Sequence, residues 1–159
     1  MTDADARIHE AFVRQCIELA AEAVTAGNEP FGAVLVADGV IRHTARNQVV
    51  TRSDPTRHAE LLLVSEASQR LERDVLSRAT LYTSTEPCLM CCGAIYWSRI
   101  PRVVFGCSAG AMGALAGGSL ATSSRQLFSH GRRPVSVIGP ILEEEALAVH
   151  RAYWSREIP

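Results

Sequence analysis

The sequence predicts an α/β fold in which helices cover both faces of a β-sheet. Segments with strand and helix periodicity alternate along the chain, and two strand-then-helix units are followed by further strands, an order that implies this layering. The 159 residues are the length of one domain and suffice to bury a core without disulfides. We therefore expect residues 1–159 to form one domain of ordinary globular composition, with 47% hydrophobic and 21% charged residues.

The first half of the chain predicts two helices on either side of a β-hairpin. Apolar residues follow helical periodicity up to Gly27, which ends the pattern. Two short strand-like runs flank Asp38-Gly39, a dipeptide typical of a tight hairpin turn. Asp54 can cap a helix and Pro55 suits its first position, so a second helix should begin there. The expected elements are a helix over 5–26, strands over 31–37 and 40–47, and a helix from 54 through His58 to about 71.

The second half continues the alternation of strands and helices. A helix is expected to start at Pro87, since proline is favoured in the first turn. A stretch rich in Gly, Ala and Ser follows and is expected to be a loop that shapes the site or an oligomer contact. The expected elements are strands over 80–84, 102–106 and 135–138, helices over 87–98 and 143–154, and the loop over 108–124.

The charge balance argues against a nucleic-acid partner. The formal net charge is -1, and all 16 cationic residues are arginines. They are scattered along the chain, and Arg132-Arg133 is the only adjacent pair. Nucleic-acid binding proteins usually gather a basic excess on one face, because phosphate contacts supply much of the affinity.

The sequence is expected to be that of a cytoplasmic protein. No apolar stretch approaches the length of a membrane span, and the acidic N-terminus does not have the shape of a signal peptide. The five cysteines are an odd number, with Cys91 and Cys92 adjacent. Such usage favours a reducing compartment and metal binding over a disulfide framework.

Two short motifs, His58-Ala59-Glu60 and Pro87-Cys88-Leu89-Met90-Cys91, supply candidate metal ligands. Imidazole and thiolate are ligands that zinc prefers, and three protein ligands leave a fourth position for water, as in catalytic sites. Cysteines three residues apart face the same side of a helix, whose N-terminus favours the thiolate. Helical geometry alone also admits Cys92 as a ligand. A structural zinc site, with Glu60 as fourth ligand or bystander, is a further alternative.

The combined pattern H-x-E…P-C-x-x-C is typical of zinc deaminases and selects Cys91. Its surroundings resemble the cytidine deaminase superfamily, and more narrowly the branch with guanine deaminases, fungal-type cytosine deaminases and tRNA adenosine deaminases. The resemblance rests on Asn47, Asp54-Pro55-Thr56-Arg57-His58-Ala59-Glu60, Thr83-Ser84-Thr85-Glu86-Pro87-Cys88-Leu89-Met90-Cys91, Glu29-Pro30-Phe31-Gly32-Ala33 and Arg102-Val103-Val104-Phe105-Gly106. It implies a three-layer α/β/α fold with a mixed five-stranded sheet, one zinc ion per chain and frequently a homodimer.

The resemblance also implies roles for individual residues. His58, Cys88 and Cys91 would bind zinc, and Glu60 would act as general acid and base in releasing an exocyclic amine as ammonia. The implied substrate contacts are Asn47, Ala59, Phe31, Trp97 and Trp154. Simpler explanations remain open for some of these residues: Asn47 could cap a turn, Phe31 could belong to the core, and the aromatic end of the last helix could be ordinary amphipathic packing.

The expected substrate is a small free nucleobase or analogue of the guanine, cytosine or aminotriazine type. Tyr96-Trp97 is similar to guanine deaminases, whereas tRNA adenosine deaminases usually lack this aromatic pair. Those enzymes also tend to carry Asp and Lys after the last motif strand, where this chain has residues 108–113 without either. Two alternatives are a tRNA-specific adenosine deaminase and a non-catalytic, zinc-stabilised nucleotide-binding module.

The C-terminal segment, residues 143–159, could close over the site. The acidic residues at its start, Glu143, Glu144 and Glu145, could include a second proton carrier or could simply complement the helix dipole. Other polar residues show no ligand spacing. Cys16 and Cys107 are expected in the core, and the remaining histidines are expected at the surface: His9, His43, His130 and His150.

Overall fold

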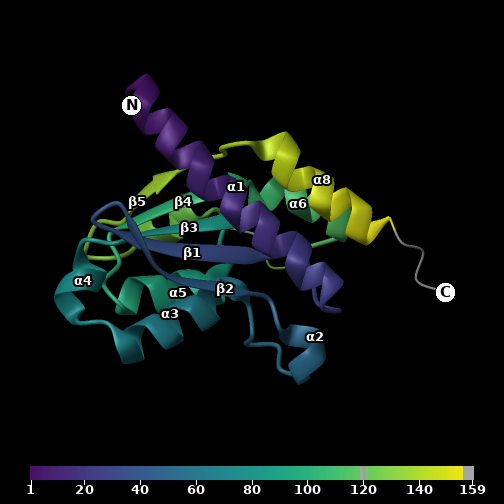
Figure 1. Cartoon of the computed structure of the whole chain (residues 1–159), viewed down its shortest axis with the longest axis horizontal. Coiled ribbons are helices and arrows are strands. Elements are labelled where there is room, and N and C mark those ends of the chain that lie inside the picture. The colour runs from purple at the N-terminus through teal and green to yellow at the C-terminus, as the bar shows by residue number, and fades with distance from the viewer. Residues whose placement is uncertain (119, 121, 156–159) are drawn as a thin grey trace.

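The computed structural model describes residues 1–118, 120 and 122–155, and a mixed five-stranded sheet lies at its centre (Figure 1). The strand order is β2-β1-β3-β4-β5. Strand β1 pairs antiparallel with β2 and β3, whereas β3, β4 and β5 are parallel. The strands are β1 (Gly32–Ala37), β2 (Val40–Arg46), β3 (Thr80–Thr85), β4 (Arg102–Cys107) and β5 (Ser136–Ile138). The predicted mixed five-stranded sheet is confirmed.

Helices cover both faces of this sheet, which confirms the predicted three layers. Helices α1 and α8 contact each other and lie on one face, and α3 and α5 lie side by side on the other (Figure 1). The helices are α1 (Asp3–Thr25), α2 (Val49–Arg52), α3 (Ala59–Arg70), α4 (Arg73–Ser77), α5 (Leu89–Trp97), α6 (Ala109–Ala116), α7 (Ser124–Ser129) and α8 (Glu143–Trp154).

Two hydrophobic clusters hold the layers together. Strand residues alternate between the faces, so Leu35 and Leu81 pack against α3 and α5, while Val34 and Tyr82 pack against α1 and α8. Central strands β1 and β3 are buried along their whole length. Burial on both faces fixes the register, because a slip of one residue would exchange the two clusters.

Close backbone approach at Gly32 sets the position of α1 over β1. A Cβ atom there would lie 2.4 Å from the Cys16 carbonyl oxygen and 2.7 Å from the Ala20 nitrogen. Glycine is therefore required where the sheet leads into the segment that contains Phe31.

The helix predicted to begin at Asp54 begins later. Asp54 Oδ1 instead accepts hydrogen bonds from the Thr56 backbone nitrogen and hydroxyl, at 2.9 and 2.6 Å, and so closes a turn. Helix α3 starts at Ala59, with His58 as its N-cap residue. The local preference of aspartate for turns therefore overrode the capping role that the sequence suggested.

The region over 108–124 was predicted to be a loop, but its first half is helical. Ser108 caps α6, and its side chain accepts a hydrogen bond from the Ala111 nitrogen. The glycines at 110 and 113 lower the helix propensity of this segment, so its composition did not predict a helix. Residues 119 and 121 of the predicted loop, and residues 156–159 of the predicted C-terminal segment, lie outside the described residues.

None of the helices within the described ranges is long and apolar enough to cross a lipid bilayer.

Candidate metal centre

His58 and Cys88 lie at equivalent places, each as the N-cap residue of its helix. His58 precedes α3 and Cys88 precedes α5, both with extended backbone dihedrals. These two helices pack side by side, and their N-cap residues are in contact, since His58 Nδ1 lies 3.5 Å from Cys88 Sγ. The prediction placed both residues inside the first helical turn. The N-cap position keeps them at the positive end of the helix dipole, which favours a thiolate.

Three side chains converge there at distances that suit a tetrahedral metal ion. His58 Nδ1 lies 3.5 Å from Cys88 Sγ and 3.8 Å from Cys91 Sγ. Ordinary Zn–N and Zn–S bond lengths at a tetrahedral angle would separate nitrogen from sulfur by about 3.6 Å. Within the described part of the chain, the group that could hold a metal consists of these three residues without a fourth His, Cys, Asp or Glu. The donor set therefore fits zinc with one coordination position left for a non-protein ligand.

A hydrogen bond joins the two cysteine side chains and shifts their pKa values in opposite directions, so that Cys91 holds its proton more tightly than Cys88. The pKa of Cys88 is lowered to about 4, first by its hydrogen bond with Cys91 and then by His58. The pKa of Cys91 is raised, first by the same hydrogen bond and then by burial. Because metal ligation requires thiolates, zinc binding would release the remaining proton.

Cys92 is separate from this group, which resolves the ambiguity left by helical spacing. Its thiol donates to the Pro87 carbonyl oxygen at 3.4 Å and is buried in the cluster beneath α3 and α5. Cys91, one residue earlier, points to His58 instead. Cys16 and Cys107 are buried, as expected.

Glu60 lies beside the ligand group with its carboxylate almost fully buried, at 4% exposure. Its Oε1 accepts a 2.8 Å hydrogen bond from the Thr83 hydroxyl, and Cys91 Sγ lies 3.6 Å from Oε2. Burial is the main cause that raises the pKa of Glu60, and the Thr83 hydrogen bond opposes it. A buried carboxyl group with a raised pKa can take and return a proton near neutral pH.

Asn47 caps a turn and also presents a free amide donor. Its Oδ1 accepts a hydrogen bond from the Val49 nitrogen at 3.0 Å. Among the residues that the structure describes, its Nδ2 is the buried side-chain nitrogen without a hydrogen-bond partner. An unpaired buried amide is costly, and a bound ligand that offers an acceptor would remove that cost.

Aromatic residues from both ends of the chain lie near the ligand group. The Phe31 ring is parallel to the His58 ring, with centroids 6.4 Å apart. The Phe31 ring also meets the edge of His150 at 5.1 Å, and Trp154 donates its indole N–H to that histidine. Ala59 is fully buried between His58 and Glu60. Phe31 and Ala59 thus lie beside His58, and Trp154 is linked to this region through His150. The contact of these residues with a substrate stays a prediction.

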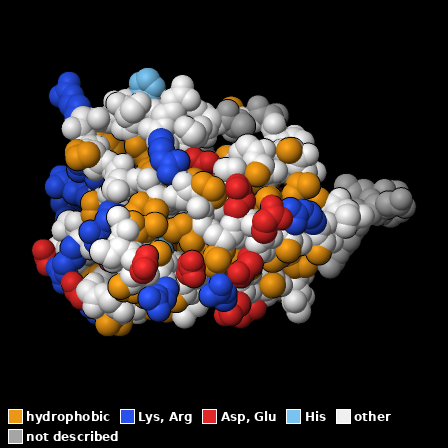
Figure 2. Space-filling model, turned by 90° about the horizontal axis from the view of Figure 1, so that it is seen from above, with side chains coloured by type: hydrophobic (Ala, Val, Ile, Leu, Met, Phe, Trp, Pro, Cys, Tyr) orange, Lys and Arg blue, Asp and Glu red, His pale blue; other side chains and the backbone are white. Residues whose placement is uncertain are grey.

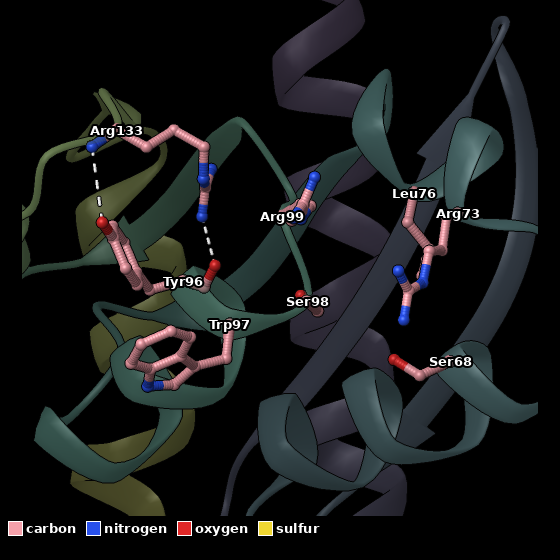
Figure 3. Close-up of a pocket in the computed structure, with 8 residues that line it drawn as sticks. All are labelled: Ser68, Arg73, Leu76, Tyr96, Trp97, Ser98, Arg99 and Arg133. Carbon is pink, nitrogen blue, oxygen red and sulfur yellow. Dashed lines mark hydrogen bonds between the residues drawn. The ribbon is translucent and has the colours of Figure 1, made fainter.

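Trp97 does not lie in this group. It is the last residue of α5, whereas Cys88 and Cys91 are at its start, and six residues of helix separate Trp97 from Cys91 by about 9 Å. Its side chain is 82% exposed and lines a hollow of about 660 Å³ that contains none of the metal ligands. Figure 3 shows Tyr96 and Trp97 on one side of this hollow, Arg73 on the other and Arg99 between them. Within one chain, Trp97 therefore lies apart from the metal ligands, and its expected contact with substrate stays a prediction.

The three acidic residues at the start of α8 have structural partners. Glu143 Oε1 accepts hydrogen bonds from the Ser108 nitrogen and hydroxyl, at 3.0 and 2.9 Å. Glu144 pairs with Arg151 and Glu145 with Arg14, both at the surface. Their geometry fits helix ends and surface ion pairs better than proton transfer at the metal group.

Sequence reasoning missed three polar residues around the site. Thr83 supports Glu60 from β3, and Glu86 accepts hydrogen bonds from the Ala109 and Ser124 nitrogens at 3.0 and 2.8 Å, which fixes both ends of the intervening segment. His150 was expected at the surface but is 1% exposed. His150 and Trp154 are four residues apart on one helix and so share a face. This spacing could have indicated that His150 lies on the same side of the helix as Trp154.

Comparison with known proteins agrees with this geometry. Residues 6–107 match the cytidine and deoxycytidylate deaminase zinc-binding region. A probable cytosine deaminase of Schizosaccharomyces pombe is 39% identical over 151 residues, which cover 91% of each chain. A tRNA-specific adenosine deaminase of Bacillus subtilis is 35% identical over 145 residues, or 91% of this chain and 88% of the relative. A solved structure of guanine deaminase from Nitrosomonas europaea superposes with a TM-score of 0.81 at 28% identity, covering 92% of this chain and 84% of that one.

The fold and the three-ligand group define a hydrolytic deaminase of the zinc type. The family match covers well over half of the residues and includes His58, Cys88 and Cys91. The chain belongs to the cytidine and deoxycytidylate deaminase family.

Proposed function

We propose that this protein removes the exocyclic amino group of a free nucleobase by hydrolysis and releases ammonia. The observation that carries the proposal is the pairing of a three-ligand metal group with a buried, non-ligating carboxyl group, Glu60. The unpaired Asn47 Nδ2 supports a small ligand with a hydrogen-bond acceptor, such as the carbonyl oxygen of a base.

His58, Cys88 and Cys91 would hold the metal, and when bound, zinc supplies the Lewis acidity that lowers the pKa of water. Glu60 would take one proton of the attacking water and deliver it to a ring nitrogen. It would then take the second proton of that water, by then on the hydroxyl group of the attacked ring carbon, and pass it to the departing amine. Thr83 would hold the Glu60 carboxylate in place through its hydroxyl. Asn47 and Phe31 would orient the ring, through the free amide and an aromatic face respectively.

Cytosine is the first base to test, because the cytosine deaminase relative matches over most of both chains. Guanine is second, on the strength of the solved guanine deaminase. Ammonia release should be measured from cytosine, guanine, an aminotriazine, cytidine and tRNA with the zinc-loaded protein. We expect release from at least one free base and none from tRNA.

A tRNA-specific adenosine deaminase is the second candidate, favoured by the Bacillus subtilis relative. The charges of this chain oppose it. Acidic and basic side chains are interspersed over the face shown in Figure 2, and the net charge is -1. Inosine formation in tRNA, with no ammonia from any free base, would replace our proposal by this one. Full zinc loading without any turnover would favour a binding module.

We also propose that a second copy of this chain covers the exposed face of α5. Trp97 is 82% exposed, and Met90, seven residues earlier and so on the same face of the helix, is 36% exposed. Large exposed aromatic side chains are enriched at protein interfaces. Sedimentation should show a homodimer that a Trp97→Glu substitution converts to monomer, whereas Leu120→Glu, at another exposed apolar residue, should leave it intact. A monomeric wild-type protein would contradict this assembly.

The five free cysteines support a reducing, cytoplasmic environment.

A further inference from the structure

His150 is a buried histidine that the chemistry proposed above does not use. It lies on α8, four residues before Trp154, and only 1% of it is exposed. Two hydrogen bonds occupy both ring nitrogens: Nε2 lies 2.8 Å from Thr85 Oγ1, and Nδ1 lies 3.3 Å from Trp154 Nε1. A buried ring with both nitrogens engaged has a fixed orientation.

The direction of these hydrogen bonds follows from their partners. An indole nitrogen can only donate, so His150 Nδ1 must accept the N–H of Trp154. The neutral ring then carries its proton on Nε2 and donates it to the Thr85 hydroxyl. Burial lowers the pKa of His150 to about 4, so the ring is neutral at neutral pH and able to accept at Nδ1.

The His150 ring also connects α8 to the metal group, which consists of His58, Cys88 and Cys91. Its edge meets the face of Phe31, with centroids 5.1 Å apart and an interplanar angle of 64°. Phe31 in turn lies parallel to the ligand His58. The Thr85 hydroxyl belongs to the last residue of β3, which leads through Glu86 and Pro87 to Cys88. His150 therefore lies between Trp154 and two segments next to the metal ligands. One segment contains Phe31, which faces His58, and the other is the end of β3, which leads to Cys88.

We propose that His150 is a positioning residue that fixes the indole of Trp154 beside the metal group, where the indole contacts the bound base. The proposal rests on the proposed function and adds to it how the C-terminal helix completes the site. Without the acceptor on His150, the indole of Trp154 loses the one hydrogen bond that fixes its orientation in the described structure.

Two substitutions of His150 test the roles of its two ring nitrogens separately. His150→Asn places a side-chain oxygen near the position of Nδ1 and so keeps an acceptor for Trp154. His150→Gln places an amide nitrogen near the position of Nε2, which keeps a donor for Thr85 but removes the acceptor. Trp154→Phe keeps a ring while removing the indole N–H. Zinc content and unfolding midpoint, measured on each variant, show that the metal group and the fold persist.

Kinetics on the free base that gives the fastest ammonia release form the first arm of the test. His150→Gln and Trp154→Phe should each raise KM by about tenfold, the equivalent of one hydrogen bond, with kcat nearly unchanged. Contacts made equally in the ground state and the transition state affect KM alone. His150→Asn should restore KM towards the wild-type value. The double variant, Gln at 150 with Phe at 154, should raise KM no further than either single variant, since both break the same bond.

Fluorescence gives a second arm that does not depend on activity. The chain has two tryptophans, so in a Trp97→Phe background Trp154 is the sole reporter. Acrylamide should quench Trp154 more strongly when His150→Gln is added, but not when His150→Asn is added. Increased quenching alone, with no base deaminated, would support the positioning role while the proposed function fails.

The positioning role is overturned by either of two results. One is equal quenching in all three proteins. The other is a KM that stays at the wild-type value in His150→Gln, or rises as much in His150→Asn as in His150→Gln, since the acceptor for Trp154 would then have no effect.

Discussion

Glu60 combines near-complete burial with a hydrogen bond from a hydroxyl group. Burial raises the pKa of the carboxyl group, and hydrogen bonds from its own backbone N–H and from the Thr83 hydroxyl partly offset this by stabilising the charged form. The same hydroxyl fixes the direction of Oε1. A proton carrier needs both an intermediate pKa and a fixed position. Thr83 thus supports the proposed chemistry without touching the metal ligands.

Replacing Thr83 with Val should lower kcat by about tenfold, because the side chain keeps its shape but loses a hydrogen bond to a charged group. Thr83→Ser, which retains the hydroxyl, is the matched control and should stay close to wild type. Steady-state ammonia release at saturating base measures both. Equal rates for Val and Ser variants would show that the Thr83 hydroxyl does not assist Glu60.

His150 should make stability depend on pH in the mildly acidic range. Its pKa is about 4 in the folded protein, whereas an exposed histidine titrates near 6.5. Between these values the unfolded chain binds more protons than the folded chain, so stability falls as the pH falls. The contribution lost by about pH 4.5 is about 2–3 kcal/mol. Urea unfolding at several pH values should show a smaller decrease for His150→Gln; an identical decrease would mean that His150 is not buried as a neutral group.

The sequence was sufficient to predict the metal ligands but not the residues that support them. His58, Cys88 and Cys91 follow from one linear pattern. Thr83 and His150 act through contacts with residues 23 and 65 positions away, which periodicity within a single element cannot reveal. Trp97 is the opposite case: it is close to the motif along the chain, yet it lies at the far end of the same helix, away from the metal ligands.

Among the helices, α8 was predicted with its observed limits, whereas α3 was predicted to start too early. An acidic first turn and a continuous amphipathic pattern define α8. Before α3, Asp54 could equally cap a helix or close a turn, and tertiary contacts such as the Gln48 nitrogen to the Arg57 carbonyl oxygen, 3.0 Å, favour the turn. Strands were predicted to within one residue at each end, because β1 is apolar after Gly32 and β3 is rich in β-branched and aromatic residues.

Gly32 gives a direct test of the packing between α1 and the sheet. A Cβ atom would overlap the backbone of α1, which cannot rotate away, so Gly32→Ala should lower the free energy of unfolding by about 1–3 kcal/mol. Gly110→Ala is the matched control, since its Cβ would meet nothing within 4 Å and alanine favours a helix. Denaturant unfolding compares the two. A Gly32→Ala protein as stable as the Gly110→Ala protein would contradict the close approach.

Four parts of the molecule, distant in the sequence, come together around the metal group. Its ligands come from the starts of α3 and α5, its carboxyl group from α3, and its aromatic neighbours from the segment before β1 and from α8. A metal ion that binds the folded chain more tightly than the unfolded chain stabilises the fold by mass action. The site and the layers that surround it should therefore be stabilised together by zinc.

Proton transfer by Glu60, beside a zinc ion held by His58, Cys88 and Cys91, can be tested by measuring zinc content and ammonia release together on wild-type protein and on Glu60→Gln. We predict one zinc per chain in both proteins, with the turnover of Glu60→Gln lowered by at least about 100-fold. Undiminished turnover in Glu60→Gln, or wild-type protein that deaminates a base without bound metal, would show that this chemistry does not take place.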